Sequence, residues 1–233
     1  MRLDKYAAYA AKSRKEIKKL ITGGKVSVNG KIIKDAGFNV KEEDNVLVDG
    51  IPFKYREFIY LLMNKPAGVV SATYDPRQKT VIDLISEEDK RFEPFPVGRL
   101  DIDTMGMLIL TNDGKMAHAL LSPSKKVPKK YVAEVDGDIT DEDIKEFENG
   151  ILLDDGYKTL PAVLNPIGKR IGEVTISEGK FHQVKRMFAH CKKHVLNLRR
   201  VEFASLKMDE SLKEGEYRHL TEEEMSVLYN IMQ

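Results

Sequence analysis

The sequence lacks the features that mark secreted and membrane-spanning proteins. Its 233 residues include a single cysteine, Cys191, so an internal disulfide framework is excluded and a reducing compartment is expected. No apolar stretch approaches the ~20 residues that a membrane span needs. We therefore expect a soluble, cytoplasmic protein with no membrane partner.

Motifs of several common enzyme classes are also missing. The chain has no Gly-x-Gly-x-x-Gly or Walker loop, so nucleotide-cofactor chemistry lacks its usual phosphate cradle, and it has no nucleophilic serine elbow. No repeat of fixed period and no low-complexity tract is present. An apolar content of 42% is nevertheless enough for a substantial core, in one large domain or two of unequal size.

Charge is unevenly distributed, although the whole chain carries a formal charge of only +1. Residues 1–34 hold ten basic residues against two acidic ones, Asp4 and Glu16. The basic residues are Arg2, Lys5, Lys12, Arg14, Lys15, Lys18, Lys19, Lys25, Lys31 and Lys34. This split indicates a basic binding module attached to a more acidic body, although a solvated helical face would have a similar composition.

The first 50 residues have the pattern of a compact unit of two helices and a hairpin. The alanine-rich residues 3–11 predict a helix, and Ser13 with Glu16 forms a capping box that starts a second, which Gly23-Gly24 ends. Asn29-Gly30 between two short β-prone runs predicts a two-residue hairpin, and residues 45–48 predict a third strand. Residues 52–56 have the composition of a linker.

This pattern resembles the S4 RNA-binding domain. The segments MRLDKYAAYA, SRKEIKKLITGGKVSVNGKII and VLVDG match that family in order and spacing. The resemblance implies that the basic second helix and the adjacent hairpin contact structured RNA through phosphates. The expected RNA-binding residues here are Arg2, Arg14, Lys15, Lys18 and Lys19.

A second informative stretch is GRLDIDTMGMLILTNDG, residues 98–114. Its apolar run at 107–110 is bounded by turn residues on both sides, which predicts a buried strand. Asp101 therefore lies on a loop braced by a core strand, where a carboxylate can be held in place and still reach a ligand.

The remainder of the chain alternates irregularly between strand and helix patterns. Strands are expected at 58–63, 69–72, 131–135, 162–164, 172–176, 195–198 and 205–208, and helices at 81–85, 115–121, 141–149, 181–194 and from Thr221. Strands outnumber helices, which favours an α+β fold with a mostly antiparallel sheet over a doubly wound one.

Two possible metal sites have weak support. His190, Cys191 and His194 share a predicted helix, but no carboxylate or second cysteine completes a site, and packing of one helix face accounts for Cys191. For Asp101 and Asp103, on a segment expected to be extended, we expect side chains that point in opposite directions, which argues against shared coordination of a metal.

Four segments together, behind the S4-like region, closely resemble the RsuA family of pseudouridine synthases. They are GRLDIDTMGMLILTNDG, KKYVAEV, NKPAGVVS and EGKFHQVKRMFAH. The similarity runs from Met1 to the C-terminal GEYRHLTEEE. One departure is Met107, where the family more often has leucine, a volume-conserving change that should affect packing only.

The resemblance implies a residue-by-residue active site. Asp101 is the family's catalytic aspartate, Tyr131 is expected to stack on the uracil and help remove its C5 proton, and Lys185 is expected to pair with Asp101 and keep it ionised. Arg186 is the adjacent candidate for RNA contact, and Arg99 would fill the gap left by a flipped uridine. No cofactor and no metal are implied.

We therefore expect an S4-like RNA-binding domain at 1–55 and a pseudouridine synthase catalytic domain at 56–233, acting as a monomer on 16S ribosomal RNA or a small-subunit assembly particle. Two alternatives stay open. One is a synthase of the same family that acts on large-subunit (23S) RNA. The other is a non-catalytic S4 protein in ribosome assembly, against which Asp101 and Tyr131 argue.

Overall fold

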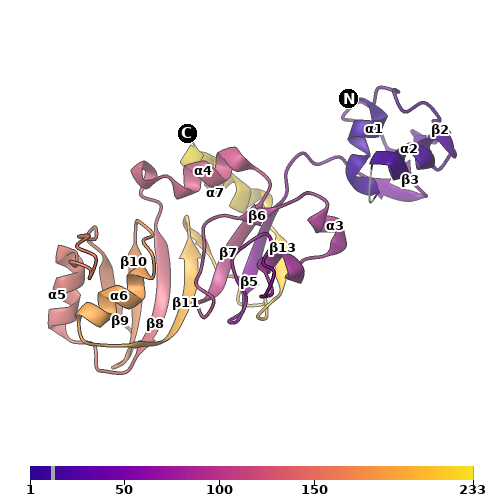
Figure 1. Cartoon of the computed structure of the whole chain (residues 1–233). Coiled ribbons are helices and arrows are strands. Elements are labelled where there is room, and N and C mark those ends of the chain that lie inside the picture. Colours follow the sequence, from indigo (N-terminus) through magenta and orange to yellow (C-terminus); the bar gives the residue numbers. More distant parts are fainter. Residues whose placement is uncertain (12–13, 233) are drawn as a thin grey trace. The chain divides into compact units, whose positions relative to one another are not determined.

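The computed structural model describes residues 1–11 and 14–232 and divides into two units (Figure 1). The first comprises residues 1–59 together with 86–93, and the second comprises 60–85 and 94–233. The segment 86–93 contains the short helix α3 (Glu87–Lys90), which the sequence did not predict. Ser86 caps this helix by accepting a hydrogen bond from the backbone N–H of Asp89.

The helices of the first unit differ in part from the prediction. The prediction of a single helix over 3–11 is wrong. Helix α1 (Leu3–Tyr6) ends at Tyr6, and a separate 3-10 turn, η1 (Ala8–Ala10), follows. The second helix is confirmed as α2 (Arg14–Thr22), although its expected capping residue Ser13 lies outside the described residues. Ile17 and Ile21 of α2 are fully buried, and they anchor the helix to the core of this unit.

A four-stranded antiparallel sheet completes the first unit, in the order β2-β1-β3-β4. The strands are β1 (Val26–Val28), β2 (Lys31–Ile32), β3 (Val46–Val48) and β4 (Ile51–Phe53). The predicted hairpin at Asn29-Gly30 is confirmed, with φ of 50° and 79° as a two-residue turn requires. The prediction of a linker from residue 52 is wrong in part: Asp49-Gly50 forms a second such turn, which brings β4 back to pair with β3.

The second unit is built on a nine-stranded sheet with the central order β13-β5-β7-β11-β8-β10-β9 (Figure 1). Its strands are β5 (Tyr60–Lys65), β6 (Phe95–Pro96), β7 (Met105–Thr111), β8 (Lys129–Val135), β9 (Val163–Pro166), β10 (Ile171–Ile176), β11 (Val195–Phe203), β12 (Leu206–Lys207) and β13 (Tyr217–His219). Among the pairings of these described strands only β7 with β11 is parallel, so the predicted α+β fold with a mostly antiparallel sheet is confirmed.

Two details of this sheet correct the sequence prediction. Strand β13 pairs with β5 but was not predicted, because its three residues, Tyr217–His219, are too short for a periodic signal. The strand expected at 69–72 is wrong, because the only ladder contact there is an isolated bridge between Val70 and Thr80.

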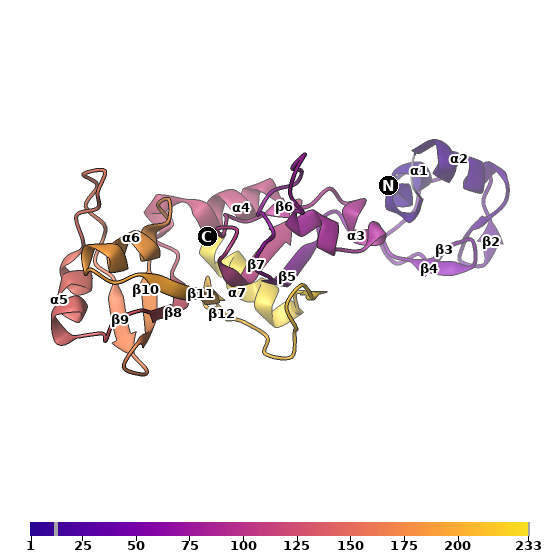
Figure 2. The ribbon, with the colours of Figure 1, turned by 60° about the horizontal axis from the view of Figure 1, so that its bottom comes forward.

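Helices cover the sheet in two groups, which the two ribbon views separate clearly (Figure 2). Helices α4 (Gly114–Leu121) and α7 (Glu222–Met232) lie near β5 and β7, whereas α5 (Asp141–Asn149) and α6 (Gln183–His190) lie beside β8, β9 and β10. Two 3-10 turns, η2 (Val81–Leu84) and η3 (Pro123–Lys125), complete the unit. In the described part of the chain, no helix is long and apolar enough to cross a membrane.

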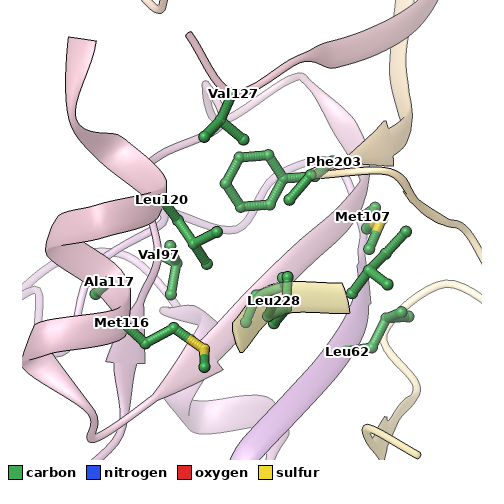
Figure 3. Close-up of a cluster of buried hydrophobic side chains, with 12 residues drawn as sticks. Leu62, Val97, Met107, Met116, Ala117, Leu120, Val127, Phe203 and Leu228 are labelled. Carbon is green, nitrogen blue, oxygen red and sulfur yellow. The ribbon is translucent and has the colours of Figure 1, made fainter. Parts of the chain in front are cut away.

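The core under α4 fixes the strand that precedes it in the chain. Met116 and Leu120 of α4, Leu228 of α7 and Phe203 of β11 converge on β7, where Met107 is fully buried (Figure 3). Met107 replaces the leucine expected at this position and packs without exposure, as a volume-conserving change should. Strand β7 is therefore held from its helix-covered face while its N-terminal end leads out of the loop that carries Asp101.

Replacement of Gly106 by alanine should destabilise the second unit strongly. Gly106 has a φ of +99°, and a Cβ there would lie 2.3 Å from the carbonyl oxygen of Arg200 across the parallel β7–β11 pair. We expect Gly106→Ala to lower the free energy of unfolding by about 2–5 kcal/mol in urea denaturation. The control is Gly114→Ala: a Cβ there meets nothing within 4 Å, so a comparable loss in both variants would contradict the steric argument.

Candidate active site

A pocket lies in the second unit between the loop before β7, the strands β8 and β11, and the turn that leads into α6. Asp101 and Arg99 line it from the loop, and Tyr131 and Lys129 line it from β8. Arg200 on β11 and His182 before α6 close the remaining sides. Segments separated by up to about a hundred residues in sequence therefore meet at one hollow.

Asp101 occupies a tight turn at the edge of this pocket. The backbone N–H of Thr104 donates to the carbonyl of Asp101 at 3.1 Å, which closes the turn directly before β7 begins. One carboxylate oxygen lies 3.2 Å from Lys185 Nζ, and the other lies 3.5 Å from His182 Nε2. The aspartate side chain is 27% exposed, so it is held by two partners from one helix start and is still accessible from the pocket.

The expectation that Asp101 and Asp103 point in opposite directions is wrong. Residues two apart share a face even on an extended segment, so the alternation rule did not support that expectation. In the structure residues 101–104 form a turn, both carboxylates reach the same ammonium, and Lys185 donates to Asp103 at 2.5 Å. The hydrogen bond from Lys185 lowers the pKa of the Asp103 carboxyl. Lys185 therefore lies between an outer carboxylate that is 67% exposed and an inner one that faces the pocket.

Lys65, at the end of β5, holds this turn from behind, and the sequence analysis missed it. Its side chain is fully buried, and Nζ lies within 3.4 Å of the backbone carbonyls of Pro66, Asp101, Ile102 and Thr104. Burial lowers the pKa of Lys65 to about 8, an effect that the nearby carboxylates of Asp103 and Asp101 oppose. The signal in the sequence was a lysine directly after an apolar strand, which by itself is typical of a solvated strand end.

Two further contacts tie the Asp101 loop to the segment after β5. Ser71 Oγ donates to the carbonyl of Leu100 at 2.9 Å and accepts from its N–H at 3.0 Å. The N–H of Gly68 donates to the carbonyl of Ile102 at 2.7 Å. The segment NKPAGVVS thus acts as a backbone clamp on both sides of Asp101.

The floor of the pocket combines an aromatic ring with two cations. Tyr131 is 8% exposed, and Arg200 is paired with it across the β8–β11 ladder and is 2% exposed. Lys129 lies on the same face of β8, and both cations flank the ring of Phe203, at 5.7 Å for Lys129 Nζ and 4.9 Å for the Arg200 guanidinium carbon. Burial, with a contribution from Arg200, lowers the pKa of Lys129 to about 8. The sequence analysis singled out neither cation.

The two arginines expected to contact RNA have different surroundings. Arg99 is exposed and lines the pocket directly before Asp101, as a residue that contacts a substrate should. Arg186, next to Lys185 on α6, is only 17% exposed and forms ion pairs with Asp154 and Asp155, the latter at 2.8 Å. Arg186 thus already has two carboxylate partners, and RNA would have to displace them.

The basic candidates of the first unit gather around α1 and α2. Arg2 and Lys18 line one hollow together with Asp4, whose carboxylate accepts from Arg2 at 3.0 Å. Lys15 and Lys19 are exposed on α2, which begins at Arg14. The first unit therefore presents exposed lysine side chains along one helix.

The metal site considered at the end of α6 does not form in the structure. His190 lies 3.7 Å from Glu146, while His194 pairs with Asp136 at 3.0 Å. Burial raises the pKa of the Cys191 thiol to about 11, so the thiolate that a metal would need is disfavoured. Among the described residues, no group of three or more His, Cys, Asp or Glu side chains could hold a metal ion.

Two family models match the chain in the order of its two units. The model described as "S4 domain" matches residues 1–46, and the model described as "RNA pseudouridylate synthase" matches residues 59–190. A solved structure titled "Crystal structure of pseudouridylate synthase" is similar over 98% of this chain and 99% of its own, with a TM-score of 0.70 and 33% sequence identity.

Several curated bacterial proteins are similar over nearly their full length. "Uncharacterized RNA pseudouridine synthase YtzG" of Bacillus subtilis is 49% identical, with 98% of each chain covered. "Ribosomal small subunit pseudouridine synthase A" of Escherichia coli is 38% identical over 97% of this chain and 99% of its own. "Ribosomal large subunit pseudouridine synthase B" of Bacillus subtilis is 40% identical over 97% of this chain and 95% of its own.

Removal of the Lys65 ammonium should loosen the Asp101 turn. Lys65→Met keeps an unbranched buried side chain but removes the ammonium donor from the carbonyls of Asp101 and Thr104 and leaves Asp101 with the Thr104 N–H alone, which we expect to cost on the order of 3 kcal/mol of unfolding free energy. Hydrogen exchange at the Thr104 amide should accelerate relative to the rest of β7. Lys115→Met, at an exposed position of α4, is the control, and equal exchange in all three proteins would mean that other contacts hold the turn.

Proposed function

The chain belongs to the family of RNA pseudouridylate synthases, and we propose that it converts a uridine of 16S ribosomal RNA to pseudouridine with Asp101 as the catalytic residue. The observation that carries this proposal is a single pocket-facing carboxylate that two cationic or potentially cationic side chains, Lys185 and His182, hold on a backbone-clamped turn. No other carboxylate lines the described part of this pocket.

The proposed reaction is an isomerisation in which atoms balance without an oxidant or co-substrate. The bond between uracil N1 and ribose C1′ breaks, the base turns, and a bond between C5 and C1′ forms. The proton on C5 leaves, and N1 gains one. A group that can stabilise the ribose carbon or move a proton is sufficient, and a fixed carboxylate can serve in either capacity.

Asp101 and Tyr131 divide the proposed work between them. The Asp101 carboxylate, paired with Lys185, would attack or stabilise C1′ while the glycosidic bond is broken. The Tyr131 ring, nearly buried on the pocket floor, offers a face on which the uracil can stack and a hydroxyl that can assist removal of the C5 proton. Lys185 contacts Asp101 but does not itself line the pocket. It therefore acts as a positioning residue.

The substrate uridine must leave its base stack to reach this pocket. Chemistry at C1′ and at C5 cannot take place inside a stacked helix, so the nucleotide has to be flipped out. Arg99, exposed directly beside Asp101, is placed to occupy the gap that the flipped base leaves. Arg186 would contribute to RNA contact only after its ion pairs with Asp154 and Asp155 are exchanged for phosphates.

We assign RNA docking to an S4 domain at residues 1–55 and the chemistry to a catalytic domain at 56–233. Lys15, Lys18 and Lys19 on α2, with Arg2 and Arg14, would neutralise phosphates of structured RNA. The enzyme would act as a monomer, in the cytoplasm where its ribosomal substrate is assembled, on 16S RNA or on a small-subunit particle.

Large-subunit (23S) RNA is the second candidate substrate. A large-subunit synthase of Bacillus subtilis and a small-subunit synthase of Escherichia coli are almost equally similar to this chain, at 40% and 38% identity. We place 16S RNA first because the small-subunit relative is covered over 99% of its length, compared with 95% for the large-subunit one. A non-catalytic role in ribosome assembly would leave the carboxylate pocket without a purpose.

Asp101→Asn should abolish pseudouridine formation. The amide retains the size of the carboxylate but removes its charge and nucleophilicity, so we expect no tritium release above background from 5-tritiated 16S RNA, while RNA affinity stays within about twofold. Asp103→Asn is the matched control, because it alters the other carboxylate on Lys185 and should retain activity within about tenfold. Full turnover by Asp101→Asn would overturn the assignment of the catalytic residue.

The same two variants also identify the target RNA. Ribosomal RNA from a strain that lacks the gene, complemented with the wild-type chain, Asp101→Asn or Asp103→Asn, can be mapped with carbodiimide. We expect one position of 16S RNA to lose its pseudouridine in the deletion strain and with Asp101→Asn only. A loss confined to 23S RNA would establish the second candidate instead.

The basic face of α2 should set the salt dependence of RNA binding. Replacing Lys15, Lys18 and Lys19 together by glutamine removes three charges, which should reduce the slope of log K against log salt by about 2 to 3. Lys145, Lys169 and Lys207, exposed lysines of the second unit, form the control triple and should change the slope less. An equal effect of the two triples would mean that docking is not centred on the first unit.

A further inference from the structure

An exposed two-ring stack lies directly beside the pocket. The rings of Phe181 and His182 are stacked with centroids 3.8 Å apart and planes 18° apart, and Phe181 is 73% exposed. His182 lines the pocket, and its Nε2 lies 3.5 Å from Asp101. The stack therefore begins at an open aromatic face and ends at the proposed catalytic carboxylate.

The backbone at this stack is held in a conformation that few residues adopt. His182 has a φ of 48°, in the left-handed region that costs a residue with a Cβ on the order of 1–3 kcal/mol. A strain of that size persists only where surrounding contacts fix it. An exposed phenylalanine kept in this way gains nothing for the core, since most of its surface faces water.

Buried hydrogen bonds supply the contacts that fix the turn. Gln183, 4% exposed, accepts from the N–H of Lys180 at 2.9 Å and donates to Glu178 at 2.8 Å. Glu178 in turn accepts from the Tyr157 hydroxyl at 2.6 Å. Arg186 also donates to the carbonyl of Phe181 at 3.3 Å. The Phe181 ring is therefore displayed on a preformed turn, which lowers the entropy lost when a ligand binds.

Charge around the ring favours an RNA ligand. Lys180 precedes Phe181, with its ammonium 4.2 Å from the centroid of the Tyr157 ring, and Arg99 lines the same pocket as Lys180 and His182. Aromatic faces flanked by basic side chains are the usual way in which proteins hold unpaired bases, since every base has a stacking face and is joined to a phosphate. An apolar protein partner would not account for the flanking cations.

We propose that the open face of Phe181 binds an unpaired nucleobase of the RNA next to the flipped uridine, extending the Phe181–His182 stack by one ring. This inference rests on the proposed function for the identity of the flipped nucleotide. The stacked neighbour holds the strand in place while the uridine occupies the pocket, so the ring contributes to RNA binding and to registration rather than to bond making.

Removal of the ring should weaken RNA binding without affecting the fold. In the Asp101→Asn background, which keeps RNA unmodified, Phe181→Ala should raise the Kd for the RNA by about 5- to 150-fold, the usual value of one base–aromatic stack. Phe181→Tyr should stay within about twofold, and Phe181→Leu should resemble Phe181→Ala, since it keeps apolar bulk but no ring. Tyr74→Ala, at another exposed aromatic of the second unit, should bind normally.

A kinetic and a spectroscopic measurement complete the test. With Asp101 intact, Phe181→Ala should raise KM far more than it lowers kcat. In a separate measurement, 2-aminopurine is placed beside the target uridine, and its fluorescence should be quenched by the wild-type chain but not by Phe181→Ala. Binding by Phe181→Ala within twofold of the parent, or equal binding by the leucine and tyrosine variants, overturns the proposal. If the wild-type chain modifies neither 16S nor 23S RNA, the proposed function fails, and the binding comparison on those RNAs still decides whether Phe181 stacks on a base.

Discussion

The site depends on one buried ammonium. Lys65 is fully buried at the end of a central strand, and four backbone carbonyls take the place of the water that its charge would otherwise hold. A cation is costly to bury unless such partners converge on it, so the ammonium and the turn at 101–104 require each other. The shape of that turn directs the Asp101 carboxylate into the pocket. It also brings Asp103 to Lys185, the lysine that pairs with Asp101. Every other feature of the site is arranged around this fixed point.

The basic residues of the chain do two different kinds of work. Those of α6 are engaged inside the second unit: Lys185 bridges two carboxylates, and Arg186 holds Asp154 and Asp155. Lys15, Lys18 and Lys19 of α2 are exposed and follow one helical face. A basic helix in a sequence therefore does not by itself indicate an RNA contact, because acidic partners brought in by the fold can already neutralise its charge. Among the described residues of α2, Lys15, Lys18 and Lys19 have no such acidic partner and leave their charge exposed along one helix.

Elements with local signals were predictable, whereas those set by distant partners were not. The turn at Asn29-Gly30, the helix at 141–149 and the apolar run of β7 each contain their own cause and were found. Strand β13 and the role of Lys65 depend on partners more than thirty residues away. The contact of Asp103 with Lys185 likewise depends on a partner 82 residues away. Asp101 and Tyr131 were located through family resemblance, and the structure adds the pocket that they share.

The lining of the pocket suits a base that must turn while it is detached. Leu100, Ile176, Val184 and Leu198 contribute apolar side chains, whose contacts have no preferred direction and so do not oppose rotation in the plane of a ring. Directional groups share the lining, with Asp101 on the loop and Arg200 and Lys129 on the sheet. Tyr131 provides a flat face against which rotation keeps the stacking contact. For a reaction in which the same base leaves through N1 and returns through C5, apolar contacts and a flat ring hold the base at both stages, whereas a pocket that matched every polar atom of uridine would hold it only at the first.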